Sequence, residues 1–545
     1  MTIRPSNILA PTTDPQDMLG VLWLSYHFNI RLWIKPYVIS QIGTSRRTLT
    51  EGHYTQEIYP ARTRLGDNVA AHLTFYLKNE IPTLEFLARL FYKIDGRLIQ
   101  DWVNAEPTGR YARRVAFLYE WLTDERLEPP SDIGGGYVDI LDGDKVVVAN
   151  TPIKDNRWRV NNNIAGTKDF APMVVKTPML LSAIDFDVKE HLTQLRQEFG
   201  EDLLVRASVW ITLRESRASF AIEGEGGQES RIERFARVIA EQVGQGEIPL
   251  SNERLGVLQE AIIGKSISIK HFGLRQSPVF VGESNYRHAK EIVHYIAPPC
   301  EEVPSKLEGL NAFFMGTKGQ SSLMRSAVIA FGFVYIHPLA DGNGRIHRFL
   351  MNDVLRRDGQ TDDPVILPIS KAIIDSPTTK RAYDAILDAI SKPLMQSLED
   401  KYHFTGKPTT YADGIKSNLV VQADKNTQSL WRYMDLTAHT QYLSELIRQV
   451  ISIDMAEESA YLRAYDKTRQ AIKEVIEMSN QDADRIIRSI LDNKGVRSNK
   501  LVKEYELLGD DELWERLVGV AGCRLYTYDA ADEEGGGDAG GWRSD

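Results

Sequence analysis

One twelve-residue segment, HPLADGNGRIHR at positions 337–348, constrains the fold of this chain more than any other. It leads into apolar side chains at Ile346, Phe349, Leu350 and Val354. Their i, i+3, i+4, i+8 spacing is typical of an amphipathic helix with one buried face. The glycine-rich turn therefore opens a helix. The first amides of a helix have no intrahelical acceptor and the helix dipole is positive there, so this turn suits an anion.

The residue types in the turn indicate which anion. Gly342 and Gly344 let the backbone approach a phosphate without interference from a Cβ atom. Arg345 and Arg348 are three residues apart, so they share one helical face and can both reach the far end of a polyphosphate. Asp341 is a hard oxygen ligand suited to a Mg²⁺ ion that bridges phosphate oxygens.

His337 lies on the other side of the turn, where a near-neutral imidazole could take a proton from an attacking hydroxyl. Together these residues predict nucleotide transfer to a hydroxyl. Simpler interpretations exist for each one: Asp341 or Asn343 as a helix N-cap, His-Pro as a turn, and the arginines as a solvated helix face. Their joint occurrence in order favours the functional interpretation.

The segment resembles the signature of the Fic family, His-x-Phe-x-(Asp/Glu)-Gly-Asn-Gly-Arg-x-x-Arg, with Leu339 where the family usually has Phe. The resemblance implies AMPylation, in which AMP moves from ATP to a Tyr, Thr or Ser hydroxyl of a target protein, with Mg²⁺. The roles that it implies are a general base at His337, a Mg²⁺ ligand at Asp341, phosphate contacts at Gly342, Asn343 and Gly344, and contacts to the outer phosphates at Arg345 and Arg348.

A second pattern, Ser219-Phe-Ala-Ile-Glu223-Gly224, resembles the family's inhibitory motif, (Ser/Thr)-x-x-x-Glu-(Gly/Asn). A carboxylate on Arg348 would occupy the guanidinium face that should hold the γ-phosphate. The resemblance implies a self-inhibited enzyme whose inhibitory motif precedes the signature, and in some relatives the same Glu supports AMP removal. The alternative is a surface Glu at a helix C-terminus before a C′ glycine.

The strand-like run Leu274–Gly282 has turn residues at both ends. It resembles the family's flap, a hairpin that holds the target segment by β-augmentation. The resemblance assigns this role to Val279, Phe280 and Val281. An ordinary core hairpin is the alternative.

Composition limits the class of protein. The chain has 545 residues, enough for several domains, and its 42% apolar and 26% charged residues are ordinary for a globular protein. A formal charge of −10 argues against general nucleic-acid affinity. Cys300 and Cys523 offer neither a disulfide framework nor a metal-binding spacing. No long apolar run or signal segment is present, so we expect a cytoplasmic protein without membrane contact.

The predicted fold class is mainly α: a Fic-type helical catalytic domain with a short β-hairpin flap, flanked by helical N- and C-terminal regions. Within region 1–130, Arg110, Arg113 and Arg114 are predicted to form a solvated helix face, with contact to nucleic acid or a partner as the less favoured alternative. Within 131–200, Asp142-Gly143 predicts a hairpin turn. The predicted regions are a helical region 1–130, a connector 131–200, the catalytic domain 201–400, a linker 401–425, a helical region 426–520 that resembles a helix-turn-helix, and a disordered tail 521–545 that looks foreign to the chain.

Several alternatives stay open. The same site could use another nucleotide donor or mainly remove AMP. A nucleotide-sensing regulator is the other class, with base contacts from Arg497, Asn499 and Lys500, although the acidic chain makes DNA the less favoured partner. The expected partner is a protein with an accessible hydroxyl, which could be the chain itself, and a homodimer is open. His294 and His347 are predicted to be structural.

Overall fold

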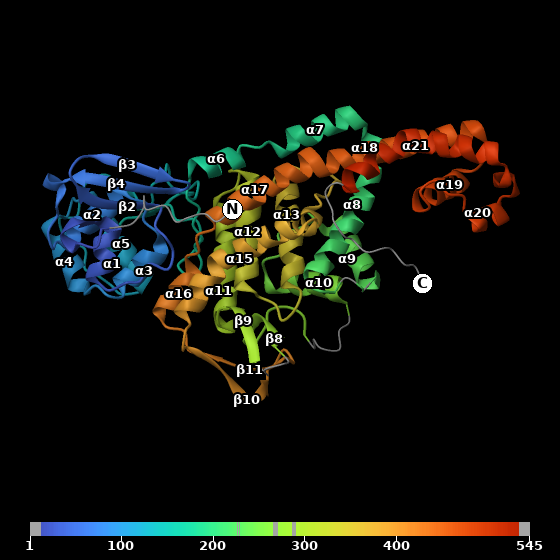
Figure 1. Cartoon of the computed structure of the whole chain (residues 1–545). Helices are drawn as coiled ribbons and strands as arrows, with labels where there is room; N and C mark the ends of the chain where they lie inside the picture. The colour runs from blue at the N-terminus through green and yellow to red at the C-terminus, as the bar shows by residue number, and fades with distance from the viewer. Residues whose placement is uncertain (1–11, 226, 228, 265–270, 286–289, 534–545) are drawn as a thin grey trace. The chain divides into compact units, whose positions relative to one another are not determined.

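The computed structural model describes residues 12–225, 227, 229–264, 271–285 and 290–533. Helices dominate this part of the chain and the strands form small sheets, which confirms the predicted fold class (Figure 1). The chain divides into two compact units, each assembled from three stretches. The first contains Met1–Phe186, Ser219–Gln360 and Arg381–Glu445, and the second contains Asp187–Ala218, Thr361–Lys380 and Leu446–Asp545.

The N-terminal part of the first unit contains a sheet that the prediction of a helical region missed. Its strand order is β1-β2-β4-β3, with β2 parallel to β4 and the other pairs antiparallel. The strands are β1 Met18–Leu19, β2 Val38–Gly43, β3 Arg47–Glu51 and β4 Tyr54–Pro60. Strand β3 is almost entirely exposed, so it shows no apolar alternation that a sequence pattern could detect.

Five helices pack beside this sheet around a core that includes Trp23, Leu87 and Trp158. They are α1 Gly20–His27, α2 Val69–Asn79, α3 Leu84–Phe91, α4 Gly96–Ala105 and α5 Arg110–Thr123. Helices α3 and α4 follow one another closely but are separate. Asp95 accepts a hydrogen bond from the Arg97 amide at 2.9 Å and begins α4 as its N-cap, which ends the helical run before it.

The prediction of a solvated arginine face on α5 is wrong for two of its three members. Arg113 and Arg114 are buried and donate to backbone carbonyls, Arg113 to Gly136 at 3.1 Å and Arg114 to Ile140 at 2.6 Å. Burial lowers the pKa of both guanidinium groups. These side chains therefore attach the following connector to α5, and only Arg110 is exposed.

The predicted hairpin at Asp142-Gly143 is also wrong. Strand β5 Val138–Asp139 pairs in parallel with β7 Val160–Asn162, which pairs antiparallel with β6 Ile153–Asp155. The backbone of Leu141 is held by the Asn163 amide, which donates to Leu141 O and accepts from Leu141 N, both at 2.9 Å. Val146 pairs instead with Val175. Helix α6, Pro178–Ile184, follows.

The remainder of the first unit is a helical body with two hairpins. Helix α12 is buried on nearly every face and packs along α13. The helices are α9 Glu229–Gln242, α10 Asn252–Ile263, α11 Val303–Gly316, α12 Ser322–Ile336, α13 Asn343–Arg357, α15 Pro377–Ser397, α16 Lys425–Arg432 and α17 Thr437–Gln449; the hairpins are β8 Phe280–Asn285 with β9 Lys290–Ile296, and β10 Tyr402–Thr410 with β11 Lys416–Val421.

The second hairpin corrects the predicted linker 401–425. Strands β10 and β11 pair antiparallel, with an irregularity between Phe404 and Thr409. This irregularity includes Gly406 and Pro408, the residues that suggested a linker.

The second unit is helical. It contains α7 Val188–Phe199, most of α8 Glu201–Ile222, α14 Ile369–Ile374, a π-helical turn Val450–Asp454, α18 Met455–Val475, α19 Asn480–Asp492, α20 Asn499–Glu504 and α21 Asp511–Glu533. Helix α8 pairs with α18 through Arg206 and Asp466 at 2.6 Å.

Two expectations for the C-terminal region need correction. The helical pattern does not break at Ala521: this residue is buried in a small core with Leu517 and Trp514, and α21 continues to Glu533. Residues 534–545 lie outside the described part. Arg497, one of the three residues named for a base contact, donates to Gly509 O at 2.9 Å and pairs with Asp511 at 2.6 Å, so a base would have to displace these partners.

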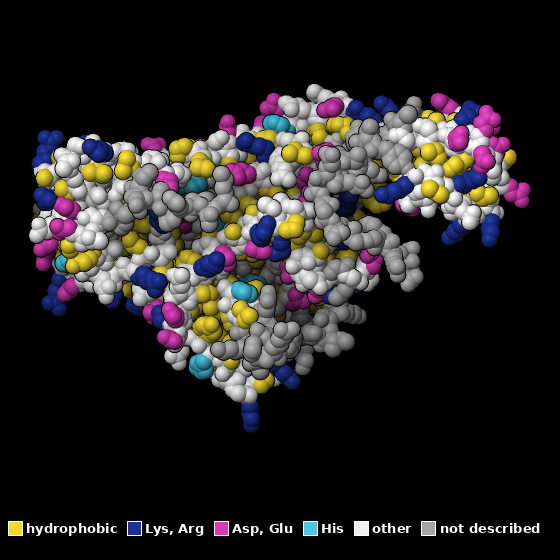
Figure 2. All heavy atoms as spheres, viewed as in Figure 1, with side chains coloured by type: hydrophobic (Ala, Val, Ile, Leu, Met, Phe, Trp, Pro, Cys, Tyr) yellow, Lys and Arg dark blue, Asp and Glu magenta, His cyan; other side chains and the backbone are white. Residues whose placement is uncertain are grey.

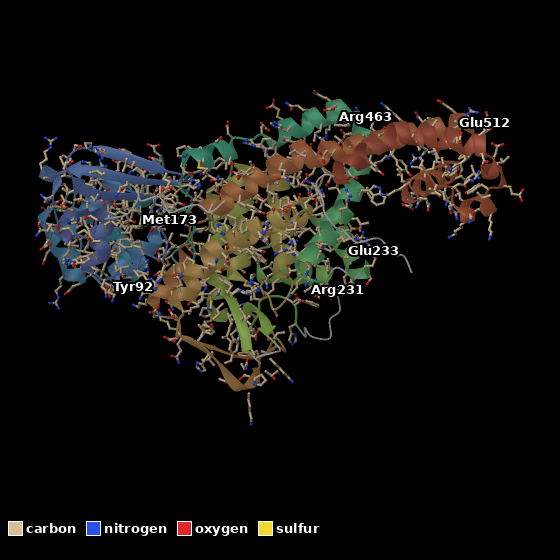
Figure 3. The ribbon with its side chains drawn as sticks, viewed as in Figure 1. Tyr92, Met173, Arg231, Glu233, Arg463 and Glu512 are labelled. Carbon is tan, nitrogen blue, oxygen red and sulfur yellow. The ribbon has the colours of Figure 1, made fainter. Side chains whose placement is uncertain are left out.

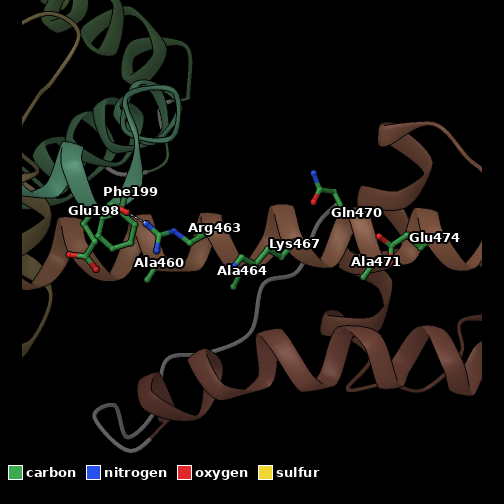
Figure 4. A pocket seen from close by; sticks show the side chains of 9 residues that line it. All are labelled: Glu198, Phe199, Ala460, Arg463, Ala464, Lys467, Gln470, Ala471 and Glu474. Atoms are coloured by element: carbon green, nitrogen blue, oxygen red, sulfur yellow. Dashed lines mark hydrogen bonds between the residues drawn. The ribbon is translucent and has the colours of Figure 1, made fainter.

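The surface of the second unit has a hollow of about 650 Å³ beside α18, lined in part by Glu198, Arg463, Lys467 and Glu474 (Figure 4). Arg463 lies over the ring of Phe199, 4.2 Å from its centre. Charges of both signs line it, and none of the predicted site residues does. No helix in the described ranges has the length and apolar composition needed to cross a membrane.

We predict different effects for two arginines of α5. Arg114→Ala should lower the free energy of unfolding of the N-terminal part by roughly 2–3 kcal/mol, because it leaves the Ile140 carbonyl without its charged donor. Arg110→Ala, on the same helix but exposed, should change it by less than about 0.5 kcal/mol. Urea denaturation followed by tryptophan fluorescence measures both. Equal small effects would contradict the buried contact.

Candidate active site

The predicted turn joins two packed helices. Helix α12 ends at Ile336, His337 adopts a left-handed conformation with φ 51°, and α13 begins at Asn343 after Gly342 with φ 91°. Gly342 is the N-cap position and makes no side-chain cap, as glycine must. No side-chain cap therefore uses the first amides of α13, where the sequence predicts an anion.

His337 is held as a neutral imidazole. Its Nδ1 lies 3.1 Å from Val334 O, and because a carbonyl only accepts, Nδ1 carries the proton and Nε2 keeps its lone pair. Burial, followed by the positive charge of Arg275, lowers the pKa of His337 to about 4 from its ordinary 6.5. At neutral pH the side chain can therefore accept a proton at Nε2.

Arg275 is a residue that sequence reasoning missed. It is buried and donates to three carbonyl oxygens: His337 at 2.7 Å, Ser277 at 2.8 Å and Pro298 at 2.6 Å. The backbone adds a hydrogen bond from Arg275 N to Pro338 O at 2.9 Å. Burial lowers the pKa of this guanidinium to about 10. Arg275 thus fixes the backbone of His337 from outside the twelve-residue segment.

Asn343 has a different role in this structure from the predicted phosphate contact. Its amide is buried and spans the turn: Nδ2 donates to Leu339 O at 2.8 Å and Oδ1 accepts from Leu339 N at 3.0 Å. The side chain therefore closes the loop. Leu339 itself is fully buried, so leucine fills the packing position where the family usually has phenylalanine.

Two further residues hold the turn and were not predicted. Gln259 on α10 donates to Asp341 O and accepts from Gly273 N, both at 2.8 Å. Asp413, in the turn of the β10–β11 hairpin, accepts from Gln276 N and Ser277 Oγ, both at 2.8 Å. A glutamine and a hairpin aspartate carry no sequence signal for such roles, because their partners lie 82 and 136 residues away.

The predicted inhibitory residues lie at Arg348. Its side chain is only 2% exposed. Nε donates to Ser219 Oγ at 2.7 Å, and Nη2 donates to Ser219 O at 3.0 Å and to Glu223 Oε1 at 2.7 Å. Burial acts to raise the pKa of Glu223, but the charge of Arg348 outweighs it and the pKa falls below its ordinary value. Glu223 is therefore ionised at neutral pH.

The same carboxylate also covers the start of α13. A Cβ atom at Gly344 would collide with Glu223 Oε1, so the oxygen lies directly against the first turn of this helix. An anionic oxygen at a helix N-terminus occupies the position that suits a phosphate oxygen. The arrangement fits a polyphosphate site in which the carboxylate stands in for a phosphate.

Arg345 is equally buried, at 2% exposed, and is also paired. Nη2 lies 2.9 Å from Asp341 Oδ1 and Nη1 lies 3.2 Å from Glu225 Oε2. Asp341 is 44% exposed, which leaves its carboxylate accessible beside the helix N-terminus. Mg²⁺ in nucleotide sites is commonly held by one or two carboxylates and the phosphates, so a single Asp341 fits such an ion.

The predicted flap forms strand β8 of a hairpin, and the sequence did not predict its partner β9. Phe280 pairs with Ile296 and Val281 with Tyr295, while Val279 precedes the strand and accepts from Ala297 N at 3.1 Å. In the described part of the chain this sheet has two strands, so the outer edge of β8 is open to a further strand. Phe280 also packs edge-on against Phe404 of β10, with ring centres 5.3 Å apart.

Two further histidines, His347 and His294, were predicted to be structural. His347 is buried, with Nδ1 2.7 Å from Ala330 O and its ring edge-on to Phe331, and burial lowers its pKa to about 3. It packs α13 against α12, in agreement with a structural role. His294 is an exposed residue of β9.

Comparison with known proteins agrees with this geometry. Residues 249–355, from just before α10 to the end of α13, match the model of the Fic/DOC family. This part of the chain is therefore similar to the Fic domain. Both the 337–348 turn and the β8–β9 hairpin lie inside the matched range, whereas Ser219 and Glu223 precede it.

Individual relatives are distant. Protein adenylyltransferase fic-1 of Caenorhabditis briggsae is 27% identical over 112 residues, which cover 21% of this chain and only 20% of that protein. Among solved structures, a Fic family protein from Desulfovibrio desulfuricans shares 18% identity over 60% of this chain and 83% of that chain, with a TM-score of 0.35. A Fic domain containing signaling protein from Bacteroides thetaiotaomicron shares 17% identity over 50% and 97%, with a TM-score of 0.33.

The histidine environment generates a titration prediction. His337 should titrate with a midpoint near 4, measured by NMR on protein with ¹³C-labelled histidine and assigned with His337→Gln. Arg275→Gln should raise this midpoint, because it removes a positive charge that disfavours the imidazolium. Since the unfolded chain binds this proton at about 6.5, His337 should contribute stability that is lost as the pH falls from about 6.5 towards 4. A midpoint of 6.5 or above would contradict the described environment.

Proposed function

We propose that this protein is a protein adenylyltransferase that transfers AMP from ATP to a Tyr, Thr or Ser hydroxyl of a target protein. The observation that carries the proposal is the placement of a neutral His337, with Nε2 as its acceptor, across one turn from an anion-binding helix N-terminus with two buried arginines. The similarity to an adenylyltransferase over 112 residues supports it.

The proposed reaction is a single displacement at phosphorus. His337 Nε2 takes the proton of the target hydroxyl as its oxygen attacks the α-phosphorus of ATP. The new O–P bond forms while the bond from the α-phosphorus to the bridging oxygen breaks, and pyrophosphate leaves with that electron pair. His337 then returns the proton to solvent or pyrophosphate.

The remaining residues would stabilise charge and hold the reactants. The first amides of α13 and the guanidinium groups of Arg345 and Arg348 would bind the phosphates and the charge that develops on the leaving group. Asp341 would hold Mg²⁺, which supplies charge neutralisation when bound. Arg275 and Asn343 would act as positioning residues, because their hydrogen bonds fix the backbone on both sides of Pro338.

We further propose that Glu223 inhibits the enzyme. An arginine presents one bidentate face to an oxyanion, and Glu223 with Ser219 already uses the donors of Arg348. A γ-phosphate must displace the carboxylate or bind elsewhere, and elsewhere the α-phosphorus is out of line with the target hydroxyl. The target segment would pair with the outer edge of β8, at Val279, Phe280 and Val281.

Three proteins test the proposal: the parent, Glu223→Gly, and Glu223→Gly with His337→Ala, each incubated with α-³²P-labelled ATP and Mg²⁺. Little label is expected on the parent, because the ion pair excludes the productive pose. Strong self-labelling is expected for Glu223→Gly, and the His337→Ala addition should reduce it by at least about a hundredfold, the usual range for loss of a general base. Autoradiography after denaturing electrophoresis measures it.

Competition with unlabelled nucleotide is the control for this labelling experiment, and separate results would contradict separate parts of the proposal. Excess unlabelled ATP should abolish the label, and competition by another nucleotide alone would indicate a different donor. Equal label on the parent and Glu223→Gly would remove Glu223 from its inhibitory role. No label on any of the three with any nucleotide triphosphate would overturn the transferase.

A further inference from the structure

A second carboxylate lies beside Glu223 and pairs with the other arginine of the turn. Glu225 Oε2 is 3.2 Å from Arg345 Nη1, and the same oxygen is 3.2 Å from Arg231 Nη1. Arg231 lies on α9 (Figure 3). Arg345 is almost fully buried, whereas Glu225 and Arg231 are both partly exposed. Glu225 therefore bridges a buried arginine of the site and an arginine at its margin.

The end of α8 explains why two carboxylates face one site. Gly224 has φ +74°, its amide donates to Ala221 O at 3.0 Å, and the next amide donates to Phe220 O at 2.9 Å. This pair of bonds is a Schellman cap, which reverses the chain after a helix. Because the cap turns at Gly224, the side chains on its two sides, Glu223 and Glu225, both reach α13, one turn apart at Arg348 and Arg345.

We propose that Glu225 is a second inhibitory carboxylate, which holds Arg345 as Glu223 holds Arg348. The inference rests on the proposed function, since it concerns the arginines that would bind the outer phosphates of ATP. Glu223, Glu225 and Asp341 together contribute three negative charges, and they pair with Arg231, Arg345 and Arg348. A triphosphate thus meets a site in which neither arginine is available until a carboxylate leaves.

The two contacts should differ in how easily they open. Glu225 already has a second partner, so it can leave Arg345 and keep its ion pair with Arg231. Glu223 contacts Arg348 and lies against the first turn of α13, so its departure needs a larger change of the α8 terminus. Arg231 is therefore a positioning residue that receives Glu225 when the nucleotide enters.

Equilibrium binding tests this inference without requiring any transfer. All proteins carry His337→Ala, so that ATP is not consumed, and ATP or AMP is titrated calorimetrically with Mg²⁺ into the parent, Glu225→Gln, Glu223→Gln and the double variant. Glu233→Gln is the matched control, since Glu233 is an exposed glutamate on α9 (Figure 3). Melting temperatures check that each variant folds.

Glu225→Gln should tighten ATP binding by about fivefold, the upper range for a partly exposed ion pair. It should tighten binding further in the Glu223→Gln protein, because the two carboxylates act on different arginines. AMP, which lacks the outer phosphates, should gain less than twofold, and Glu233→Gln should change neither ligand. Unchanged ATP binding in both backgrounds, or an equal gain for AMP, would overturn the proposal.

A double-mutant cycle tests the role of Arg231. Arg231→Gln should weaken ATP binding at least threefold more in the protein with Glu225 than in Glu225→Gln. Without Arg231, Glu225 loses one of its two arginine partners and should stay on Arg345, where it competes with ATP. If the effects of Arg231→Gln and Glu225→Gln on the free energy of ATP binding are additive, Arg231 does not position Glu225. If Glu223→Gly incorporates no label from ATP, only the proposed transferase activity fails. The binding series is independent of that result, because it measures how the carboxylates affect ATP binding whether or not transfer occurs.

Discussion

A buried guanidinium needs acceptors for its N–H donors, and the start of α13 contains two buried arginines in one turn that find them on carboxylates. Arg345 and Arg348 are each 2% exposed, and the charge of a guanidinium persists at any physiological pH. In this structure the anions are carboxylates of the same chain, supplied by the cap that ends α8 and by Asp341. The architecture around the turn serves to bring these groups together, so that a nucleotide would compete with side chains already in place.

The proposed base depends on contacts that come from far along the chain. His337 occupies a left-handed position between two helices, and its carbonyl is held by Arg275. The segment of Arg275 is held in turn by Asp413 of the β10–β11 hairpin, through Gln276 and Ser277. This hairpin lies beyond the range that matches the Fic/DOC family, so part of the scaffold of the turn comes from outside that range.

Local patterns in the sequence were sufficient to predict the 337–348 turn and the helix after it. Each of these depends on residues within a few positions of one another. Long-range contacts could not be predicted in this way: Arg113 and Arg114 look like a charged surface until carbonyls of the connector cover them. The same holds for the Asp142-Gly143 turn, because Asn163 takes the backbone bonds that a hairpin would use. Asn343 differs from these cases, because its amide bonds to Leu339, only four residues away, and the resemblance gave no sign of this contact.

The most direct test of the central claim is crystallographic: the parent and Glu223→Gly, each soaked with Mg²⁺ and a non-hydrolysable ATP analogue. In Glu223→Gly, the γ-phosphate should contact Arg348, and the α-phosphorus should lie in line with a hydroxyl position near His337 Nε2. In the parent, the Glu223–Arg348 pair should persist and the analogue should be absent or bound in another pose. The same productive pose in both crystals, with the ion pair intact in the parent, would contradict it.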